Sequence, residues 1–351
     1  MTWKHILLLA PDEKDATSFY RCWGPFSELV RTTKTPIMLS RASHVAWSTL
    51  LDKHLLMIQR PCFPNHLKVL EMAHQANPDL VTWVDWDDLL WQIPEGNPAK
   101  KGFGDPKVLY GVILRCVQQA DIVTVSTPFF QRCFPEELQA KITVLRNRLP
   151  RHWRRQTPHC KPTQKRVKIA WRGSATHIID WMEFLEAAIT LSTQQPIEWV
   201  LIGSPPYHVM ASLRRVATVT CIEEIAIEQY GQWFIHEGPQ ADILFVPLHD
   251  NAFNRVKSHI AMLEATFAGM LSVAPKWEEW TTGIPGADRL LYTNPDQAFA
   301  CLERAIAQAR QGAFTLVADL QTHFLAQFHT NDTLFHQLAF TTKGDLLCDK
   351  D

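Results

Sequence analysis

Short runs of apolar residues recur along the whole chain, separated by segments long enough to form helices. The runs show no strict alternation of apolar and polar positions, which is typical of parallel strands covered on both faces. Two such series, with helical segments such as 180–194 and 254–268 between the runs, predict two doubly wound α/β domains. The predicted strands are residues 4–10, 54–60, 79–85, 120–126 and 142–147 in the first series, and 167–173, 198–203, 219–224, 241–248 and 270–275 in the second.

The 351-residue chain is long enough for two domains of ordinary size. A segment at 148–166 separates the two series. It contains three prolines, few apolar residues and many charges, which favours a linker. We therefore expect an N-terminal Rossmann-like domain at 1–150, a basic linker at 151–166, a second Rossmann-like domain at 167–315, and a C-terminal helix and tail at 316–351.

Composition narrows the class of protein only slightly. Hydrophobic residues make up 46% and charged residues 20%, as in ordinary globular proteins, and the net charge of −1 favours neither nucleic acid nor any other partner. The eight cysteines form no C-x-x-C pair, which is typical of free thiols in a reducing compartment and favours a cytoplasmic location. The apolar run at 6–10 is too short for a signal-peptide core or a membrane span.

A stretch without acidic residues, from Leu138 to Ile179, contains many lysines and arginines. Three interpretations stay open: a solvated interdomain loop, a cleft wall that faces phosphate, and contact with an anionic surface. Because the stretch includes Trp153, we expect weak attachment to the inner face of a membrane, with each cation near the surface contributing about 1 kcal/mol. Arg154 and Arg155 would supply part of that attraction.

In open α/β sheets, ligands bind beyond the carboxyl ends of the strands, often at helix N-termini. The most unusual of these turns follows the fourth strand of the second series. Here we expect Asn254 to cap a helix, with Lys257 and Ser258 in its first turn. Glu264 would follow two turns later on roughly the same face. Arg255 and Lys257 are unfavourable at a helix N-terminus unless an anion is bound, so they favour an anion site. The alternative is an asparagine cap with exposed basic side chains.

Two further turns follow strands of the second series. Gly173 and Ser174 offer a tight turn with a hydroxyl and free backbone amides. His177 would lie in the loop after them, and Asp180 would cap the next helix. Gly203 begins another Gly-Ser turn. A plain turn is the alternative interpretation for both segments.

Three carboxylates, those of Asp85, Asp87 and Asp88, lie within four positions at the end of a strand in the first series. Such a cluster can bind a divalent cation, orient sugar hydroxyls or supply a general base. We expect it to face the cleft between the domains. The alternative is that Asp87 or Asp88 caps a short helix that begins at Leu89.

Residues 253–275, FNRVKSHIAMLEATFAGMLSVAP, resemble the signature of group-1, family 4-type glycosyltransferases, which have the two-domain GT-B fold. The motif F-N-x-x-K-S, followed by a glutamate, a glycine and a strand, is matched by Phe253, Asn254, Lys257, Ser258, Glu264 and Gly269. The segment WRGSATHIIDW at 171–181 resembles a second motif of this branch, G-S-x-x-H-x-x-D. Residues 125–150 resemble the close of the first domain, where Asn147 follows a strand. The aspartate cluster also resembles part of that domain.

The resemblance implies two Rossmann-like domains that face each other across a cleft, with a nucleotide-sugar donor bound mostly to the second. Glu264 would bind the ribose. Lys257 and Arg172 would neutralise the diphosphate without a metal ion. The other donor-binding residues would be Gly173, Ser174, Gly203, Asn254 and Ser258, and the catalytic residues would be Asp85, Asp87, Asp88 and His177. The resemblance further implies a retaining transferase without a cofactor and a hydroxyl acceptor on a glycan, a lipid-linked molecule or a protein.

The chain departs from the family pattern at two places. The first of the family's two motif glutamates would fall on Val256, which cannot hydrogen-bond a sugar. The first domain also lacks a glycine-rich loop after its first strand, where Ser18, Tyr20 and Arg21 are the candidates for that role. These departures leave two alternatives to a transferase: a non-catalytic module that binds a nucleotide-sugar or glycan, and a sugar-nucleotide epimerase of the same architecture.

Overall fold

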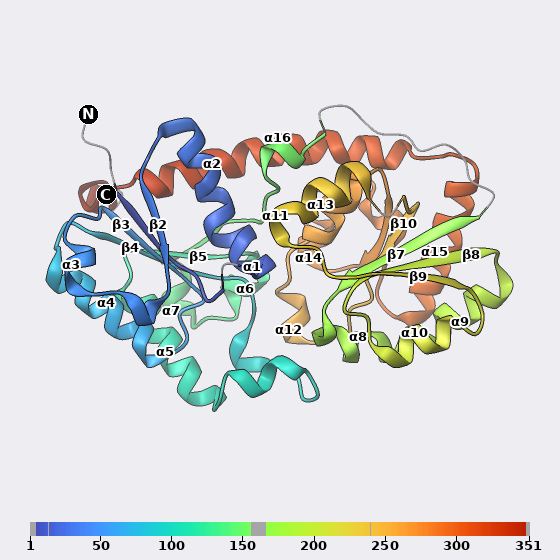
Figure 1. The fold of residues 1–351 in the computed structure, drawn as a ribbon, viewed down its shortest axis with the longest axis horizontal. Coiled ribbons are helices and arrows are strands. Elements are labelled where there is room, and N and C mark those ends of the chain that lie inside the picture. Colours follow the sequence, from blue (N-terminus) through green and yellow to red (C-terminus); the bar gives the residue numbers. More distant parts are fainter. Residues whose placement is uncertain (1–4, 13, 156–165, 239, 349–351) are drawn as a thin grey trace.

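The computed structural model describes residues 5–12, 14–155, 166–238 and 240–348. Two parallel six-stranded sheets lie side by side (Figure 1), with the strand orders β2-β1-β3-β4-β5-β6 and β12-β11-β10-β7-β8-β9. The first sheet contains β1 (Ile6–Leu9), β2 (Ile37–Ser40), β3 (Leu55–Gln59), β4 (Val81–Trp86), β5 (Ile122–Val125) and β6 (Ile142–Val144). The second contains β7 (Val167–Gly173), β8 (Ile197–Gly203), β9 (Thr218–Ile222), β10 (Ile243–Phe245), β11 (Leu271–Pro275) and β12 (Leu291–Tyr292).

Helices flank both sheets. Those before the second sheet are α1 (Ala16–Ser18), the π-helix η1 (Phe19–Trp23), α2 (Gly24–Thr33), α3 (Trp47–Leu50), α4 (Pro64–Ala76), α5 (Pro106–Gln119), α6 (Pro128–Arg132) and α7 (Glu136–Gln139). Later in the chain come α8 (Ile178–Met182), α9 (Leu185–Gln194), α10 (Tyr207–Leu213), α11 (Ile227–Gln232), the π-helix η7 (Trp233–Glu237), α12 (Ala252–Arg255), α13 (Ile260–Phe267), α14 (Glu278–Thr281), α15 (Pro295–Arg310), α16 (Thr315–Phe340) and α17 (Lys343–Cys348). Short 3-10 helices complete the set: η2 (Ala42–His44), η3 (Leu90–Gln92), η4 (Pro98–Gly102), η5 (Arg151–Trp153), η6 (Ala175–His177) and η8 (Ala287–Leu290).

The prediction of a two-sheet α/β fold is confirmed, and the strands that sequence analysis missed lie at sheet edges. Strand β2 is only partly buried because it has a strand on one side only. Strand β12 is two residues long. The two long helices predicted at 180–194 and 254–268 are each broken in two, into α8 with α9 and α12 with α13. The second break shapes the candidate site described below.

Helix α16 packs against both halves of the molecule (Figure 1). Near its middle, Phe324 and Phe328 are buried in the core of the second sheet. Towards its end, Phe335 and Ala339 are buried with Ile6 and other residues of the first sheet. Each fully buried phenylalanine contributes about 1.5–3 kcal/mol through the apolar surface that it removes from water. The helix therefore holds the two sheets together. Among the described residues, no helix is long and apolar enough to cross a bilayer.

Trp153, Arg154 and Arg155, the residues of the basic stretch expected at a membrane surface, have partners inside the protein, which argues against that role for them. Trp153 is fully buried and stacks on Phe19, with ring centroids 5.0 Å apart. Arg154 donates through Nη1 to Asp332 Oδ2 in α16 at 2.9 Å, and Arg155 donates to the carbonyl oxygen of Ile235. Burial of an aromatic ring and pairing of the cations leave this part of the stretch unsuited to a lipid surface. Residues 156–165 of the expected linker lie outside the described residues.

Candidate functional site

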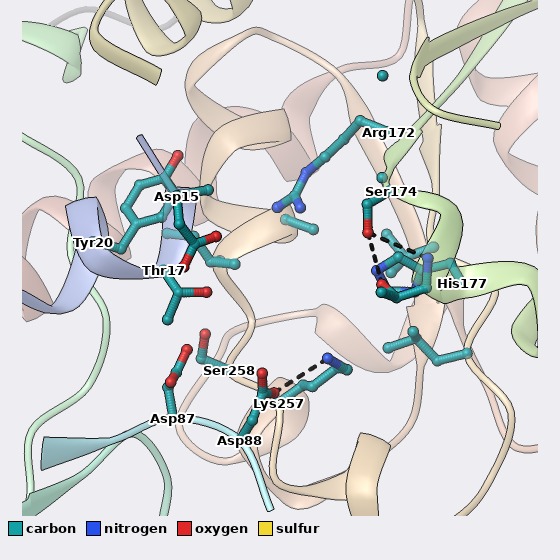
Figure 2. Close-up of a pocket in the computed structure, with 18 of the residues that line it drawn as sticks. Asp15, Thr17, Tyr20, Asp87, Asp88, Arg172, Ser174, His177, Lys257 and Ser258 are labelled. Carbon is teal, nitrogen blue, oxygen red and sulfur yellow. Dashed lines mark hydrogen bonds and ion pairs between the residues drawn. The ribbon is translucent and has the colours of Figure 1, made fainter. Parts of the chain in front are cut away.

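A cavity of about 760 Å³ lies where the carboxyl ends of strands from both sheets meet (Figure 2). Its first wall comes mainly from the segments after β1, β3 and β4, and its second mainly from the segments after β7, β8, β9 and β10. Most site residues predicted from the sequence line this cavity: Tyr20, Asp87, Asp88, Arg172, Gly173, Ser174, His177, Gly203, Asn254, Lys257, Ser258 and Glu264. Ser18, Arg21, Asp85 and Arg255 do not. The arrangement follows from topology, because parallel strands end on one edge of each sheet.

The expectation that Asp85 faces the cleft is wrong. Strand β4 continues to Trp86, and the side chain of Asp85 is fully buried inside the first half. Its carboxylate accepts from Arg21 at 3.0 Å (Nε to Oδ2) and at 2.5 Å (Nη2 to Oδ1). Arg21 also donates to Asn147, which in turn donates through Nδ2 to Ser258 Oγ at 2.7 Å. Asp85 thus anchors a buried chain of hydrogen bonds that reaches the cavity at Ser258.

Asp87 and Asp88, which follow β4, form the acidic part of the first wall together with Arg60, which follows the neighbouring strand β3. Arg60 Nε lies 2.6 Å from Asp87 Oδ1, and Arg60 Nη2 pairs with Asp88. Sequence analysis missed Arg60. Its backbone adopts a left-handed conformation with φ of 54°, which non-glycine residues rarely adopt outside turns and functional sites. Neither aspartate caps the helix after Leu89.

The surroundings of Asp87 and Asp88 shift the pKa values of the two carboxyl groups in opposite directions. Burial raises the pKa of Asp87 to about 6, against the opposing effect of Arg60 and with the support of the neighbouring Asp88 charge. Burial also opposes the charge of Asp88, but Lys257 and Arg60 outweigh it and lower the pKa of that carboxyl. The two aspartates raise the pKa of Arg60, although burial acts in the other direction. Adjacent carboxyl groups with diverging pKa values are typical of functional sites.

Lys257 and Ser258 lie in the break between α12 and α13, not in the first turn of one helix as expected. Asn251, in place of Asn254, caps α12 by accepting from the Asn254 amide. The helix α13 begins only at Ile260, so Lys257 and Ser258 precede it. Lys257 Nζ lies 3.3 Å from Asp88 Oδ1 of the other half. Its ammonium group also lies 4.7 Å from the centre of a phenylalanine ring.

Arg255 makes no contribution to the cavity, contrary to its expected role beside Lys257. Its Nε lies 2.5 Å from Asp250 Oδ1, and both side chains are exposed by nearly half. The Arg255 guanidinium therefore has a local acidic partner at the surface. Of the two cations expected at this turn, Arg255 and Lys257, only Lys257 lines the cavity.

Glu264 is buried at the second wall, with partners on both of its oxygens. Tyr20 Oη donates to Oε1 at 2.5 Å, and Tyr230 Oη donates to Oε2 at 3.3 Å. Arg172 Nη2 lies 2.8 Å from Oε2. Burial and the Glu264 charge raise the pKa of both tyrosines, so their hydroxyls keep their protons. Glu264 therefore orients Arg172 toward the cavity, where Figure 2 shows its guanidinium. Sequence analysis missed Tyr230.

The turns after β7 and β8 approach each other closely at two glycines. Gly203 has a φ of 90°, and a Cβ atom on it would lie 2.5 Å from the carbonyl oxygen of Gly173. The amide of Ser204 donates to that same carbonyl oxygen at 2.9 Å. Any side chain at 203 would force these two strand ends apart. The glycines thus allow the two strand ends to lie close together at the cavity wall.

His177 and Asp180 form a polar pair at the edge of the cavity, with His177 Nδ1 2.7 Å from Asp180 Oδ2. Asp180 does not cap a helix as expected, because it lies inside α8. Its other oxygen accepts from Asn254 Nδ2 at 2.6 Å and from the amide of His249. Asp180 therefore holds the turn after β7 against the turn after β10, and Asn254 is committed to this contact.

Val256, at the position of the missing motif glutamate, does not face the cavity. It is fully buried and packs in the core of the first half. Its carbonyl oxygen accepts from Thr127 Oγ1 at 3.0 Å. Within the described ranges, no group of three or more His, Cys, Asp or Glu side chains is placed to hold a metal ion.

Comparisons with known proteins identify the fold. No protein-family model matches the chain, and no curated protein sequence matches it. Among solved structures, HepE of Anabaena in complex with UDP and glucose is similar over 97% of this chain and all of HepE, with a TM-score of 0.65 and 12% identity. The lipopolysaccharide outer core galactosyltransferase WaaB is similar over 97% of this chain and 99% of its own, with a TM-score of 0.56 and 10% identity. An α-glucosyltransferase in complex with UDP and DNA has a TM-score of 0.55 at 10% identity, over 93% of this chain and 98% of its own. The chain has the GT-B fold, with two Rossmann-like halves.

Proposed function

We propose that the protein is a glycosyltransferase that moves a sugar from a nucleoside-diphosphate donor to a hydroxyl acceptor. The proposal depends mainly on one observation: Arg172 and Lys257 line a single cavity at the carboxyl ends of the two sheets of a GT-B fold. HepE, whose structure is similar to that of this chain, has been solved in complex with UDP-glucose and with UDP. Two cations on one wall of such a cavity suit a diphosphate.

The chemistry that these residues would support is stabilisation of the leaving group. The bond between the anomeric carbon and the donor phosphate oxygen breaks, and a bond from that carbon to the acceptor oxygen forms as the acceptor proton is lost. Negative charge then grows on the departing diphosphate, where Lys257 and Arg172 would stabilise it. Because Lys257 and Arg172 would neutralise the charge of the diphosphate, we propose that transfer needs neither a metal ion nor another cofactor. Retention of anomeric configuration is part of the proposal.

Glu264 would bind the ribose hydroxyls in this scheme. Its carboxylate already accepts from Tyr20 and Tyr230, so a ribose would have to replace one of these hydroxyls. Ser258 is held by Asn147 and presents its hydroxyl at the cavity wall. The glycine turn at Gly173 and Gly203 would allow the nucleotide to contact the backbone.

A second candidate is a module that binds a nucleotide-sugar without transferring the sugar. Val256 favours it, because the position of the first motif glutamate is buried in the first half and offers the cavity no carboxylate. Both candidates require nucleotide binding, and only the first requires turnover.

Incubation with a panel of nucleotide-sugars, with and without a chelator, separates the two candidates. A transferase releases nucleoside diphosphate and forms a glycoside whose anomeric configuration is visible by NMR, equally well in the chelator. Saturable binding without release of diphosphate for any acceptor favours the binding module. Failure to bind any member of the panel contradicts both.

A further inference from the structure

A small pocket lies away from the cavity, between α2, the segment that joins the two halves, and α16. Its volume is about 140 Å³, and among the described residues it shares none of its lining with the cavity. Drug-sized ligands occupy sites of about 300–1,000 Å³, so a ligand of this pocket must be a small group. Three arginines line the pocket: Arg31 in α2, and Arg148 and Arg151 in the joining segment. We refer to it as the α2–α16 pocket.

The positive charge at the α2–α16 pocket exceeds the negative charge. Glu28 and Asp332 are the carboxylates of the lining, against three arginines. The oxygens of Asp332 lie 2.5 Å from Arg148 Nη1 and 2.9 Å from Arg154 Nη1. Arg151 Nε also lies 3.5 Å from Asp332 Oδ2. Because one buried carboxylate is shared by three guanidinium groups, the cluster keeps a surplus of positive charge that a bound anion would balance.

Arg148 lines the pocket with unused hydrogen-bond donors. Its side chain is only 7% exposed, and its Cζ lies 4.2 Å from the centre of the Phe335 ring. Its Nη1 donates to Asp332 Oδ1, whereas its Nε and Nη2 make no hydrogen bond to any described residue. A guanidinium group carries five N–H donors in a rigid fork. An arginine that is held in place with most of its donors unused is suited to bind an oxyanion.

Arg31 and Arg151 are the cations of the pocket that solvent reaches. Both side chains are exposed, that of Arg151 by 62%. Arg31 has no ion-pair partner in the part of the chain that the structure describes. Glu28 accepts from the backbone amide of Arg151, so part of its hydrogen-bonding capacity is directed to the backbone. A ligand can therefore enter the pocket from the side of these two arginines.

Two histidines, His152 and His336, also line the pocket. Burial lowers the pKa of both, and the charge of Arg31 at His152 and of Arg148 at His336 adds to the effect, although nearby carboxylates oppose it. Both imidazoles are therefore mostly neutral at pH 7. In this form each can donate one N–H to a ligand oxygen.

We propose that the α2–α16 pocket binds a phosphate group, either as inorganic phosphate or as the phosphate of a monoester. A phosphate monoester carries a charge of about −1.5 to −2 and three strong acceptor oxygens. Planar guanidinium groups bind such oxygens in pairs. The inference goes beyond the proposed function and does not depend on it, because the described lining of this pocket is separate from that of the cavity.

NMR of the full chain with labelled histidines, at constant pH, tests this inference. The probes are inorganic phosphate and glycerol 3-phosphate, and chloride at equal ionic strength is the control for screening. Both phosphates should shift the signals of His152 and His336 saturably, and chloride should not. The signals are assigned from His152→Gln and His336→Gln. If neither signal shifts saturably with either phosphate, the inference is overturned.

Vesicle co-sedimentation separates a soluble monoester from a lipid phosphate. Vesicles of phosphatidylcholine with phosphatidic acid are compared with vesicles of phosphatidylcholine alone. Retention by the first kind only, lost in Arg31→Ala, supports a lipid phosphate as the ligand. Binding of glycerol 3-phosphate without retention by either kind of vesicle supports a soluble monoester.

Substitution of the exposed arginines tests where the phosphate binds. Arg31→Ala and Arg151→Ala should each weaken phosphate binding by about tenfold, because each removes a charged hydrogen-bond donor. Arg115→Ala is the matched control, because Arg115 is 60% exposed, close to the 62% of Arg151, and lies in α5 outside the pocket and the cavity. Lys257→Ala, which removes a cation from the cavity, should leave the two histidine shifts unchanged. Loss of these shifts in Lys257→Ala, or equal weakening by all three arginine substitutions, overturns the inference and leaves the proposed function standing.

Discussion

Lys257 and Asp88 form an ion pair across the cavity, with Nζ 3.3 Å from Oδ1, and they come from opposite halves of the molecule. The pair joins the two walls of the cavity. Because Lys257 is the cation assigned to the diphosphate, a bound donor would compete with Asp88 for it. Donor binding should therefore weaken this contact between the halves.

Asp88→Asn should tighten binding of a nucleoside diphosphate. The substitution removes a carboxylate that competes for Lys257, and it removes negative charge next to the bound diphosphate. We therefore expect binding to become more favourable by about 0.5–1 kcal/mol, which is typical of a partly exposed ion pair. Calorimetric titration measures the change, with Asp79→Asn as control. Weaker binding of the diphosphate by the Asp88 variant would place Lys257 away from the phosphates.

The acceptor reaction should depend on the ionisation of Asp87. Because burial raises the pKa of Asp87 to about 6, its carboxyl is protonated below that pH and accepts poorly from hydroxyl groups. The kcat/KM for the acceptor should therefore rise as the pH increases through about 6 and then level off. In Asp87→Asn the rise of kcat/KM with pH should disappear. The dissociation constant for the nucleotide should depend on pH as it does in the wild type. If kcat/KM of the variant still rises with pH as in the wild type, the group that titrates is not Asp87.

Tyr20→Phe should tighten nucleotide binding if the ribose binds to Glu264. In the free protein the Tyr20 hydroxyl occupies Oε1, and its removal leaves that oxygen available to the ribose, for a gain of about 1 kcal/mol. Glu264→Gln should weaken nucleoside binding by about 1–3 kcal/mol, because the ribose hydroxyls then lose a charged hydrogen-bond acceptor. Comparing nucleoside affinities by calorimetry tests both changes. No effect of either substitution would place the ribose elsewhere.

Asp332→Ala should destabilise the protein by about 3–5 kcal/mol without weakening nucleotide binding, because it removes the buried carboxylate that pairs with Arg148 and Arg154. Arg148 Nη1 lies 2.5 Å and Arg154 Nη1 2.9 Å from its oxygens. Burial opposes charge on both members of the Arg148–Asp332 pair and lowers the pKa of Arg148, but the surrounding arginines outweigh burial at Asp332 and lower its pKa as well. The contribution of Asp332 to stability is thus present above the ordinary carboxyl pKa and is lost as the pH falls below it.

Thermal unfolding of wild type and Asp332→Ala at pH 7 and in acid checks this prediction. The difference in unfolding free energy between the two should shrink as the carboxyl group of the wild type is protonated. Equal stability of the two proteins at pH 7 would contradict the assigned role of this ion-pair cluster between the linker and α16.

The fold was predictable because fully covered parallel strands appear in a sequence as continuous apolar runs. The same rule misses an edge strand such as β2, whose residues are partly exposed. It also could not place Asp85, because whether the last residues of a strand face the core or the cavity depends on the residue at which the strand ends. Strand β4 extends to Trp86, and Asp85 therefore lies in the core.

The site was predictable where a turn after a strand had unusual chemistry, as at Arg172 and Lys257. Arg60 and Tyr230 were missed for a physical reason. Each is a single polar residue in an ordinary segment, and its importance comes from partners brought close only by the fold, Asp87 for Arg60 and Glu264 for Tyr230. The break between α12 and α13 was missed because no glycine or proline marks it in the sequence, where Val256, Lys257, Ser258 and His259 connect the two helices.

Titration of wild type and Lys257→Ala with UDP, GDP and ADP, each compared with its nucleoside, tests the central claim most directly. The account predicts that at least one nucleoside diphosphate binds the wild type. It predicts that the substitution weakens that binding by about 1.5–3 kcal/mol, the usual contribution of a hydrogen bond to a charged group, and changes nucleoside binding little. Equal losses for the diphosphate and the nucleoside, or wild-type protein that binds none of the three diphosphates, would contradict it.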